Sequence, residues 1–574
     1  MRKTNIDINN IPAEKFAFAT EGVSLHDTKL KTKPRSYMKD AWTRFKKNKS
    51  SVAAAIIIGF LILYSIIVPV VSPYSLADTD LYYKNLPAYT VGSEWLADGA
   101  KVETVNEQRY FTYKLWEKET GDTIINKVLD IYDTTNQDGN TETLYKIRLN
   151  QYTKIGIYTW AFSVDDFIKM QKWQDETGIQ LIYPMTNTDT ATLGFDITKE
   201  TVATFAPNYY YKINRTGFAI DADGNVIKPE IDKEGNVLNY DAIQTIYRPY
   251  SARRVMNIKT TVTEVDENGN TVEKEVEKSV YQGDLYQSKF GRNEDGTYDY
   301  EYYRTTGSTT NPKDGTPEMV ACRIKYSAYF QYTKGYTPYF LFGTEINGRD
   351  IFTSIAIGAR FSLLLAVCVS FINFVIGMIY GSIEGYYGGA VDLTLERVSD
   401  ILSGVPFTVV VSLLTFYAAS PEIPWNPTPI VMLVIAFIAT GWIGTASLVR
   451  KQFYRFKGQE YVTVAKSLGA KDTRIMFKHI LPNSLGTIVT STALMIPGVI
   501  SSETMLTYLN IINLNSTTVT TVGIMLSEAN STFSSAPHAM IIPSLYLALM
   551  LISFNLFGNG LRDAFNPSLR GSED

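Results

Sequence analysis

Residues that commonly perform chemistry are scarce in this chain. Its 574 residues include three histidines and two cysteines. There is no Cys-x-x-Cys pair, no His-x-x-x-His pair, no Gly-x-Ser-x-Gly sequence, and no Gly-Lys dipeptide of the kind a P-loop contains. These patterns place metal ligands, a serine nucleophile or a nucleotide phosphate. We therefore expect no catalysis by this chain, no bound metal or cofactor, and no nucleic-acid partner.

The segment 266–277, DENGNTVEKEVE, has part of the pattern of a calcium loop. Asp266, Asn268, Asn270 and Glu277 occupy positions one, three, five and twelve. Position six is Thr271, where the sharp turn of such a loop requires glycine. A β-hairpin is the better interpretation.

One basic segment, EYVTVAKSLGAKDTRIMFKHILPN at 460–483, lies between two long apolar stretches. Apolar residues recur there with the spacing i, i+3, i+4 and i+7, which predicts a short helix with one apolar face. The residues of this face are Tyr461, Val464, Ala465 and Leu468.

Three residues of this segment are expected to mark the boundaries of two helices. Gly469 is expected to end the first helix as its C-cap, and Asp472 to cap the beginning of a second helix. Pro482 is expected where the second helix gives way to a membrane span. A short helix held by a tight turn suits docking to a partner; an ordinary solvated loop is the alternative.

Six stretches are long and apolar enough to cross a bilayer, for which about 20 residues suffice. The first carries no charge and begins after some fifty polar residues, so we interpret it as a retained anchor rather than a signal peptide. The six stretches are 51–71, 356–380, 401–419, 429–448, 485–509 and 539–557.

Charge predicts the orientation of these spans, because basic residues prefer the cytoplasmic side. Several lysines and an arginine precede the first span, and the loop 450–478 has eight basic residues against two acidic ones. No Lys or Arg occurs from His479 to Leu561. Both termini are therefore expected in the cytoplasm of a multi-pass plasma-membrane protein. The loop GSIEGYYGGAVDLTLERVSD departs from the rule by its excess of acids.

The polar tract 77–341 is then expected outside the cell, as a folded domain between the first two spans. It holds 27 of the 38 tyrosines, and disorder requires few aromatics. Alternating segments with Gly224, Gly235 and Gly269 predict hairpins, and SVDDFIKMQKWQDETG predicts an amphipathic helix. The fold is expected to be mixed α/β, mainly β. Cys322 and Cys368 offer no disulfide framework.

The fifth span contains one acidic residue, Glu503. A carboxylate at that depth normally faces a cavity or a partner. It therefore marks a candidate pathway or gate, unless it lies near the outer surface. Pro497 and Gly498 allow a local kink that either shapes a constriction or relieves packing.

The order Ala465, Gly469 and then Ile480-Leu481-Pro482 resembles the cytoplasmic signature of permease subunits of ABC importers. Four further segments resemble the C-type permease of oligopeptide and dipeptide importers. They are MKDAWTRFKKNKSSVAAAIIIG from 38, LFGTEINGRDIFTSIAIGARFSLLLAV from 341, GYYGGAVDLTLERVSDILSGVPF from 385 and NLFGNGLRDAFNPSLR from 555.

This resemblance implies an all-α transmembrane core of six helices, like a type I ABC importer permease, with alternating access driven by ATP. The partners would be a second permease subunit, two ATPases that use ATP and Mg, and an extracellular, lipid-anchored peptide-binding protein. A coupling helix would contact the ATPase. The implied contact residues are Tyr461, Val464, Ala465, Leu468, Gly469, Ala470 and Pro482.

Two features depart from the family pattern. Thr463 and Val464 stand where many relatives have Glu-Ala, so no role of that carboxylate is carried over. The tract between the first two spans is also much longer than in most relatives. Its many tyrosines suit a recognition surface, and it lies at the mouth of the implied pathway, so we interpret it as an insert that docks the binding protein or the second permease. A rigid spacer whose tyrosines form its core is the alternative. The expected domains are 1–50 cytoplasmic, 51–71 first span, 77–341 insert, 350–561 permease core with coupling loop 451–482, and 562–574 cytoplasmic tail.

Two alternatives stay open. A membrane receptor with an extracellular ligand domain would explain the large tract, although the short tails contain no recognisable signalling domain. The same transporter class could instead carry nickel or another small solute, because cargo choice in this family depends largely on the binding protein.

Overall fold

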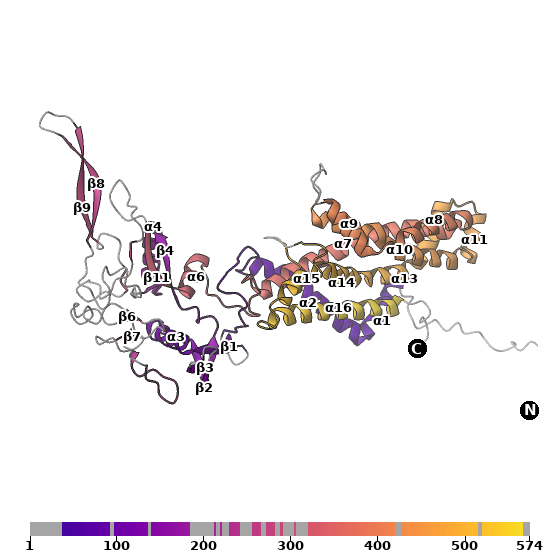
Figure 1. Cartoon of the computed structure of the whole chain (residues 1–574). Coiled ribbons are helices and arrows are strands. Elements are labelled where there is room, and N and C mark those ends of the chain that lie inside the picture. Colours follow the sequence, from indigo (N-terminus) through magenta and orange to yellow (C-terminus); the bar gives the residue numbers. More distant parts are fainter. Residues whose placement is uncertain are drawn as a thin grey trace, which may run out of the picture.

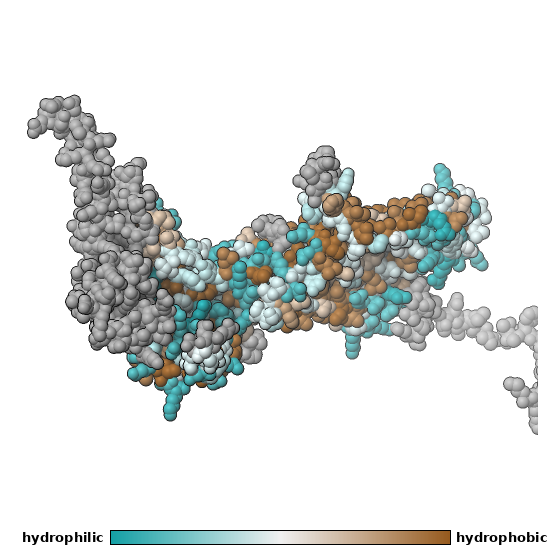
Figure 2. All heavy atoms as spheres, viewed as in Figure 1, coloured by the Kyte–Doolittle hydropathy of each residue, from teal (hydrophilic) through white to brown (hydrophobic). Residues whose placement is uncertain are grey.

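The computed structural model shows an elongated molecule with a helical bundle at one end and a β-rich lobe at the other (Figure 1). Hydrophobic residues form a long band along the bundle, with hydrophilic residues at its far end, whereas the described part of the lobe mixes hydrophilic and pale residues with smaller hydrophobic patches (Figure 2). The structure describes residues 37–91, 97–135, 139, 141–183, 212–213, 219–220, 229–240, 255–265, 271–281, 288–290, 304–305, 319–418, 428–514 and 519–565.

The bundle contains five helical segments that are long and apolar enough to cross a membrane within these described ranges, or six if one bent pair counts as a span. This agrees with the predicted number. The five are α2 (Lys49–Val71), α7 (Ile351–Tyr387), α10 (Pro429–Phe456), the continuous run Asp472–Tyr508, and α16 (His538–Phe565). Shorter helices are α1 (Tyr37–Lys47), α11 (Glu460–Ser467) and α15 (Val522–Asn530).

The third span is not the single helix predicted at 401–419. It consists of α8 (Gly389–Ser403) and α9 (Phe407–Ala418), which meet at an angle of 70°. Pro406 lies at the break and lacks the N–H that would continue α8, and the residue before a proline avoids the helical conformation. The helix restarts when the carbonyl of Pro406 accepts from Val409 and Val410 at 3.0 and 3.2 Å.

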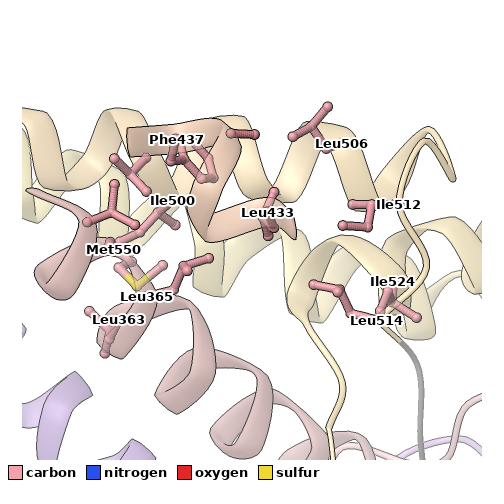
Figure 3. Packing of buried hydrophobic residues seen from close by; sticks show 14 of the residues in the cluster. Leu363, Leu365, Leu433, Phe437, Ile500, Leu506, Ile512, Leu514, Ile524 and Met550 are labelled. Atoms are coloured by element: carbon pink, nitrogen blue, oxygen red, sulfur yellow. The ribbon is translucent and has the colours of Figure 1, made fainter. Parts of the chain in front are cut away.

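Close packing of α7 on α10 depends on three glycines four residues apart. A Cβ atom on Gly377 would lie 2.6 Å from the Thr445 side chain, and one on Gly381 would lie 2.2 Å from the Ala446 carbonyl oxygen. Gly385 is similarly close to the α10 backbone. Small residues with this spacing let membrane helices approach closely. Leu363, Leu365, Leu433, Phe437, Ile500 and Met550 continue the apolar core of the bundle from several helices (Figure 3).

The β-rich lobe, the described residues between α2 and α7, contains two copies of one βαββ unit. The first is β1 (Ala100–Asn106), α3 (Glu107–Thr120), β2 (Ile125–Thr135) and β3 (Thr141–Asn150), with sheet order β1-β3-β2. The second is β4 (Ile157–Ser163), α4 (Val164–Thr177), β5 (Ile182–Tyr183) and β11 (Met319–Lys325), in which β11 pairs with both β4 and β5. All these pairings are antiparallel.

The two copies agree in register and in detail. Ala100 pairs with Asn150 in the first copy, as Ile157 does with Lys325 in the second. Both helices end at a left-handed glycine. Glu117 accepts from the N–H groups seven and eight residues later at 2.8 and 2.7 Å, and Gln174 does the same at 3.1 Å for both.

The second copy carries a long excursion, residues 184–318, between its second and third strands, where the first copy has a short turn. Its described elements are β6 (Lys212–Ile213), β7 (Ala219–Ile220), β8 (Val255–Val265), β9 (Thr271–Tyr281) and β10 (Arg304–Thr305). The β8–β9 hairpin confirms the β-hairpin interpretation of 266–277, with residues 271–277 in strand β9 and residues 266–270 outside the described structure. Gly235 has the expected positive φ of 86°, whereas Gly224 and Gly269 lie outside the described residues. The mixed α/β prediction for the lobe is correct.

The lobe joins the bundle through a buried aromatic base and α6 (Tyr326–Lys334). Asp350 caps α7 by accepting from the Thr353 N–H at 2.7 Å. Lys101 in β1 donates to the Ser535 carbonyl at 2.8 Å, in the segment between α15 and α16. The base residues are Tyr83, Leu86, Tyr152, Ile155, Tyr326, Phe330 and Phe340.

Candidate coupling surface

The predicted short helix exists as α11, and its end has the geometry of a Schellman cap. Gly469 has a φ of +81°, in the left-handed region that favours glycine. Its N–H donates to the Lys466 carbonyl at 3.0 Å, and the Ala470 N–H donates to the Ala465 carbonyl at 3.1 Å. These two bonds define the motif. The sequence therefore predicted this cap correctly.

The apolar residues predicted for docking are not used by the fold of the chain. Tyr461, Val464 and Leu468 are 38, 57 and 82% exposed, and Ala465 is partly buried. The helix is held instead by Val462, which is buried against Ile475 and its neighbours in one apolar cluster. Sequence reasoning missed Val462 because it lies outside the i, i+3, i+4 pattern. The other face remains available as an apolar surface on the end of the bundle opposite the lobe (Figure 1).

The second predicted helix differs from expectation at both ends. Asp472 is not its N-cap but its first residue, following Lys471, and its carboxylate accepts from the Tyr386 hydroxyl of α7 at 2.6 Å. Pro482 does not end the second helix. One helix runs through α12 (Asp472–Arg474), a π-helical turn at Ile475–Ile480, and α13 (Leu481–Ala493). The wider π turn displaces the carbonyls that the proline ring would meet in an α-helix. Pro482 is exposed.

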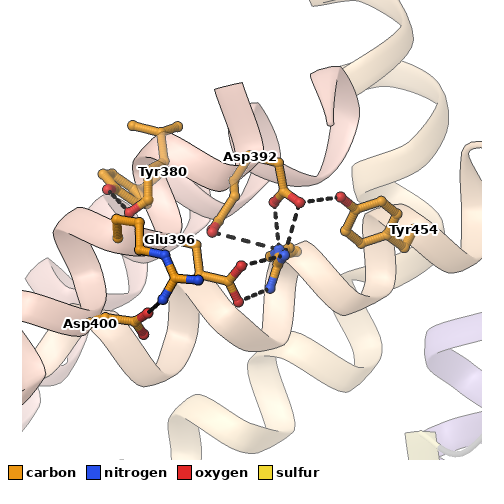
Figure 4. A network of polar contacts seen from close by, with 9 residues as sticks. Tyr380, Asp392, Glu396, Asp400 and Tyr454 are labelled. Carbon is orange, nitrogen blue, oxygen red and sulfur yellow. Dashed lines mark hydrogen bonds and ion pairs between the residues drawn. The ribbon is translucent and has the colours of Figure 1, made fainter. Parts of the chain in front are cut away.

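An ion network ties the bent third span to α10 beside this surface (Figure 4). Arg450 binds Asp392 through Nε and Nη2 at 2.6 and 2.8 Å, and binds Glu396 through Nη1 and Nη2 at 2.6 and 3.0 Å. Tyr454 also donates to Asp392, and Glu384 lies 3.6 Å from the arginine. This network explains the excess of acids in the segment that departed from the charge rule: their counter-charge comes from α10.

Glu503, in α14 (Met495–Tyr508), is fully buried inside the bundle. Its carboxylate accepts from Ser362 of α7 at 2.8 Å and from Thr507 at 3.4 Å. Thr521, the N-cap of α15, donates in turn to Thr507 at 3.2 Å. The carboxylate therefore joins three elements near one end of the bundle, and its role in a pathway or gate stays a prediction.

Leu494 alone separates α13 from α14 within the run Asp472–Tyr508, and the kink expected from Pro497 and Gly498 stays a prediction. Proline removes the N–H that would bond to the carbonyl four residues earlier, which accounts for a break before it. Pro497 is buried, and Gly498 is exposed with open space around it. Their part in a constriction is likewise still a prediction.

Comparison with known proteins identifies this architecture. Residues 373–571 match the family described as "Binding-protein-dependent transport system inner membrane component", and residues 36–88 match the "N-terminal TM domain of oligopeptide transport permease C". The chain is 37% identical over 229 residues to the oligopeptide transport system permease protein OppC of Bacillus subtilis, covering 40% of this chain and 72% of that protein. It belongs to the ABC importer permeases of the OppC type.

Other relatives of this permease carry related names. The dipeptide permease DppC of Bacillus subtilis is 36% identical over 230 residues, covering 40% of this chain and 69% of the relative. The glutathione permease GsiD of Pectobacterium atrosepticum is 33% identical over 245 residues, covering 43% and 78%. The two family matches leave 89–372 unmatched, a range that contains most of the β-rich lobe.

The short helix α11 and its cap were largely predictable from the sequence, whereas the ion network around Arg450 was not. The apolar spacing from Tyr461 to Leu468 predicted the helix, and Gly469 predicted its cap. Arg450 was counted only as one charge among eight, because nothing local to it indicates partners 54 and 58 residues away. The signal that could have found it is the unexplained cluster of acids in the loop before the third span.

Proposed function

We propose that this OppC-type permease forms half of the translocation pathway of an ATP-driven peptide importer. A second permease subunit would supply the other half, and two ATPases would bind ATP and Mg in the cytoplasm. An extracellular, lipid-anchored binding protein would deliver peptide. The observation that carries the proposal is the exposed apolar face of α11, where Tyr461, Val464 and Leu468 are 38, 57 and 82% exposed.

Three substitutions at the end of α11 test the ATPase contact without disturbing the bundle. Leu468 is 82% exposed, so Leu468→Asp should leave the fold intact and abolish peptide-stimulated ATP hydrolysis. A Cβ at Gly469 would meet nothing within 4 Å, so substitutions there act only through the backbone. Gly469→Val should therefore reduce uptake strongly, while Gly469→Asn, which tolerates the left-handed conformation, should retain most of it.

The control for all three is the amount of protein in the membrane and the recovery of the complex in detergent. Normal uptake by Leu468→Asp and Gly469→Val at normal abundance would exclude α11 as the coupling element.

The sidedness we propose places both termini and α11 in the cytoplasm and the β-rich lobe outside. Single cysteines at Lys146 and Lys471 test it in a Cys368→Ala background with an impermeant thiol reagent. Burial raises the pKa of the native Cys322 thiol to about 12, which keeps it unreactive. Labelling is expected at Lys146→Cys in intact cells and at Lys471→Cys only after permeabilisation. The reverse pattern would invert the arrangement.

Peptide is the proposed cargo because the relatives are named for oligopeptide, dipeptide and glutathione transport. Uptake of labelled di- to pentapeptides by cells with and without this permease tests this. Uptake of nickel or another small solute in place of peptides would keep the transporter and change its cargo. A receptor function would instead predict no solute uptake at all.

The lobe, in this proposal, docks the binding protein or the second permease. Its support is position, since the lobe rises from α2 and α7 at one end of the bundle (Figure 1). The expected tyrosine-rich recognition surface has less support, because Tyr83, Tyr110, Tyr113 and Tyr145 are buried in its core. A rigid spacer is therefore the competing interpretation.

A deletion separates these two interpretations. The Tyr89 N–H donates to the Phe340 carbonyl at 3.0 Å, so the two ends of the lobe lie side by side. Residues 90–338 can therefore be replaced by a short glycine bridge. Docking predicts weaker capture of the binding protein by a complex that still assembles and hydrolyses ATP. Unchanged capture and uptake would leave the lobe a spacer.

A further inference from the structure

The first helix of the chain, α1, is neither a membrane span nor part of the coupling surface. It has 11 residues, YMKDAWTRFKK, and Asn48 alone separates it from the spanning helix α2. The Asn48 side chain accepts from the Ser51 N–H at 3.3 Å and so caps α2. This short connection fixes α1 at the level where α2 enters the membrane.

One face of α1 is attached to the bundle. Ala41 and Phe45 are buried, and the Phe45 ring meets the Phe557 ring of α16 edge-on with centroids 5.6 Å apart. Ser51 at the start of α2 donates to the Leu556 carbonyl of α16 at 3.3 Å. Because α2 and α16 are both apolar spans, α1 lies against their ends rather than within a soluble domain.

The outward face of α1 combines an exposed aromatic ring with positive charge. Trp42 is 57% exposed, and the Lys46 ammonium lies 5.3 Å from its ring centroid. Lys46 and Lys47 of α1 and Lys49 at the start of α2 are all exposed. Tryptophan is enriched where a membrane meets water, and basic residues on a helix at that level attract anionic lipid headgroups.

We propose that α1 is an interfacial helix that binds anionic phospholipid headgroups, with Trp42 inserted at the headgroup boundary and the lysines beside it on lipid phosphates. The occupant is lipid rather than a protein because the charge is complementary to an anionic leaflet and the helix is continuous with a span that is surrounded by that leaflet. The lysine-rich face would stabilise the orientation of α2, on which the first span of the permease depends.

Lipid binding is tested with the full-length chain, purified with the subunits that accompany it and titrated with phosphatidylglycerol or phosphatidylcholine by native mass spectrometry. The test variant is Lys46→Gln, Lys47→Gln, Lys49→Gln. The matched control, Lys127→Gln, Lys146→Gln, Lys169→Gln, removes the same charge from exposed positions of the lobe. Each basic residue near an anionic surface contributes roughly fivefold in affinity, so the test variant should lose well over tenfold of its preference for phosphatidylglycerol.

The same triple change to arginine should retain that preference, which separates loss of charge from misfolding. A second measurement places Trp42: in nanodiscs that contain brominated phosphatidylglycerol, the fluorescence difference between the native chain and Trp42→Phe should be strongly quenched. Equal lipid preference in the test and control variants would overturn the proposal. An unquenched difference, as expected if a protein subunit covers α1, would overturn it as well.

Discussion

Replacing Arg450 should destabilise the helical bundle more than the loss of any other single charge near the candidate coupling surface. Arg450→Met keeps most of the side-chain volume but leaves Asp392, Glu396 and Glu384 facing one another. The arginine side chain is 20% exposed and that of Asp392 is 12% exposed, so this pair is largely shielded from water. The Glu396 side chain is 38% exposed, and its ion pair is correspondingly screened.

The size of the effect follows from these exposures. Breaking a fully buried pair costs about 3 to 5 kcal/mol, and the partial exposure of the Asp392 pair reduces this to about 2 to 3 kcal/mol. The screened pair with Glu396 adds about 0.5 kcal/mol. For a core of about 200 residues, the expected fall of the unfolding midpoint is about 5 to 14 °C.

The assay is thermal unfolding in detergent, followed by the fraction of protein that elutes undegraded and monodisperse after heating. Arg397→Met is the matched control, because Arg397 makes a 3.1 Å pair with Asp400 while its side chain is 69% exposed. It should leave the midpoint nearly unchanged. The triple variant Arg450→Met, Asp392→Asn, Glu396→Gln should recover much of the loss, since no uncompensated pair of charges remains there. Equal midpoints for Arg450→Met and Arg397→Met would refute this account of the network.

Two further predictions concern the lobe base and the helix packing. Burial, and then the neighbouring Glu528, raise the pKa of Glu345 to about 8, so the folded protein keeps a proton that the unfolded chain loses above about pH 4.5. Stability should therefore fall as pH rises from about 4.5 to 8, and Glu345→Gln should make the unfolding midpoint less dependent on pH. An unchanged slope of midpoint against pH in this variant would contradict the prediction. Gly381→Ala should lower the midpoint because the new Cβ would lie 2.2 Å from the Ala446 carbonyl oxygen, whereas Gly444→Ala, with nothing within 4 Å, should not. Equal effects of the two alanines would argue against close α7–α10 contact.

The spans were predictable because apolar length is a local property of the sequence. Capping residues were also sufficient to predict helix ends at Gly469 and in α4, whose Ser163 cap and Gly178 end follow ordinary capping rules. Prediction failed at proline, because a proline can either bend a helix or be accommodated within it. Pro406 bends its span by 70°, whereas Pro482 is absorbed by a π turn, and only the surrounding packing distinguishes them.

The duplicated βαββ unit escaped sequence reasoning for a different reason. Trp116, Thr120 and Gly121 recur 57 residues later as Trp173, Thr177 and Gly178, but few other positions are identical. The structure makes the repeat evident because register and capping bonds are conserved where side chains are not. The long excursion in the second copy separates β5 from β11, so the third strand of that copy cannot be recognised by spacing.

The length of α7 connects the two ends of the molecule. Its 37 residues span about 55 Å at 1.5 Å per residue, against about 30 Å for the hydrocarbon core of a bilayer. It begins at the lobe base, where Asp350 caps it. Near its other end, the Tyr386 hydroxyl donates to Asp472 of α12, the helix that follows α11. Between these points the glycines at 377, 381 and 385 hold it directly against the α10 backbone. One continuous helix, closely packed on α10, therefore contacts the lobe base at one end and the segment that follows α11 at the other.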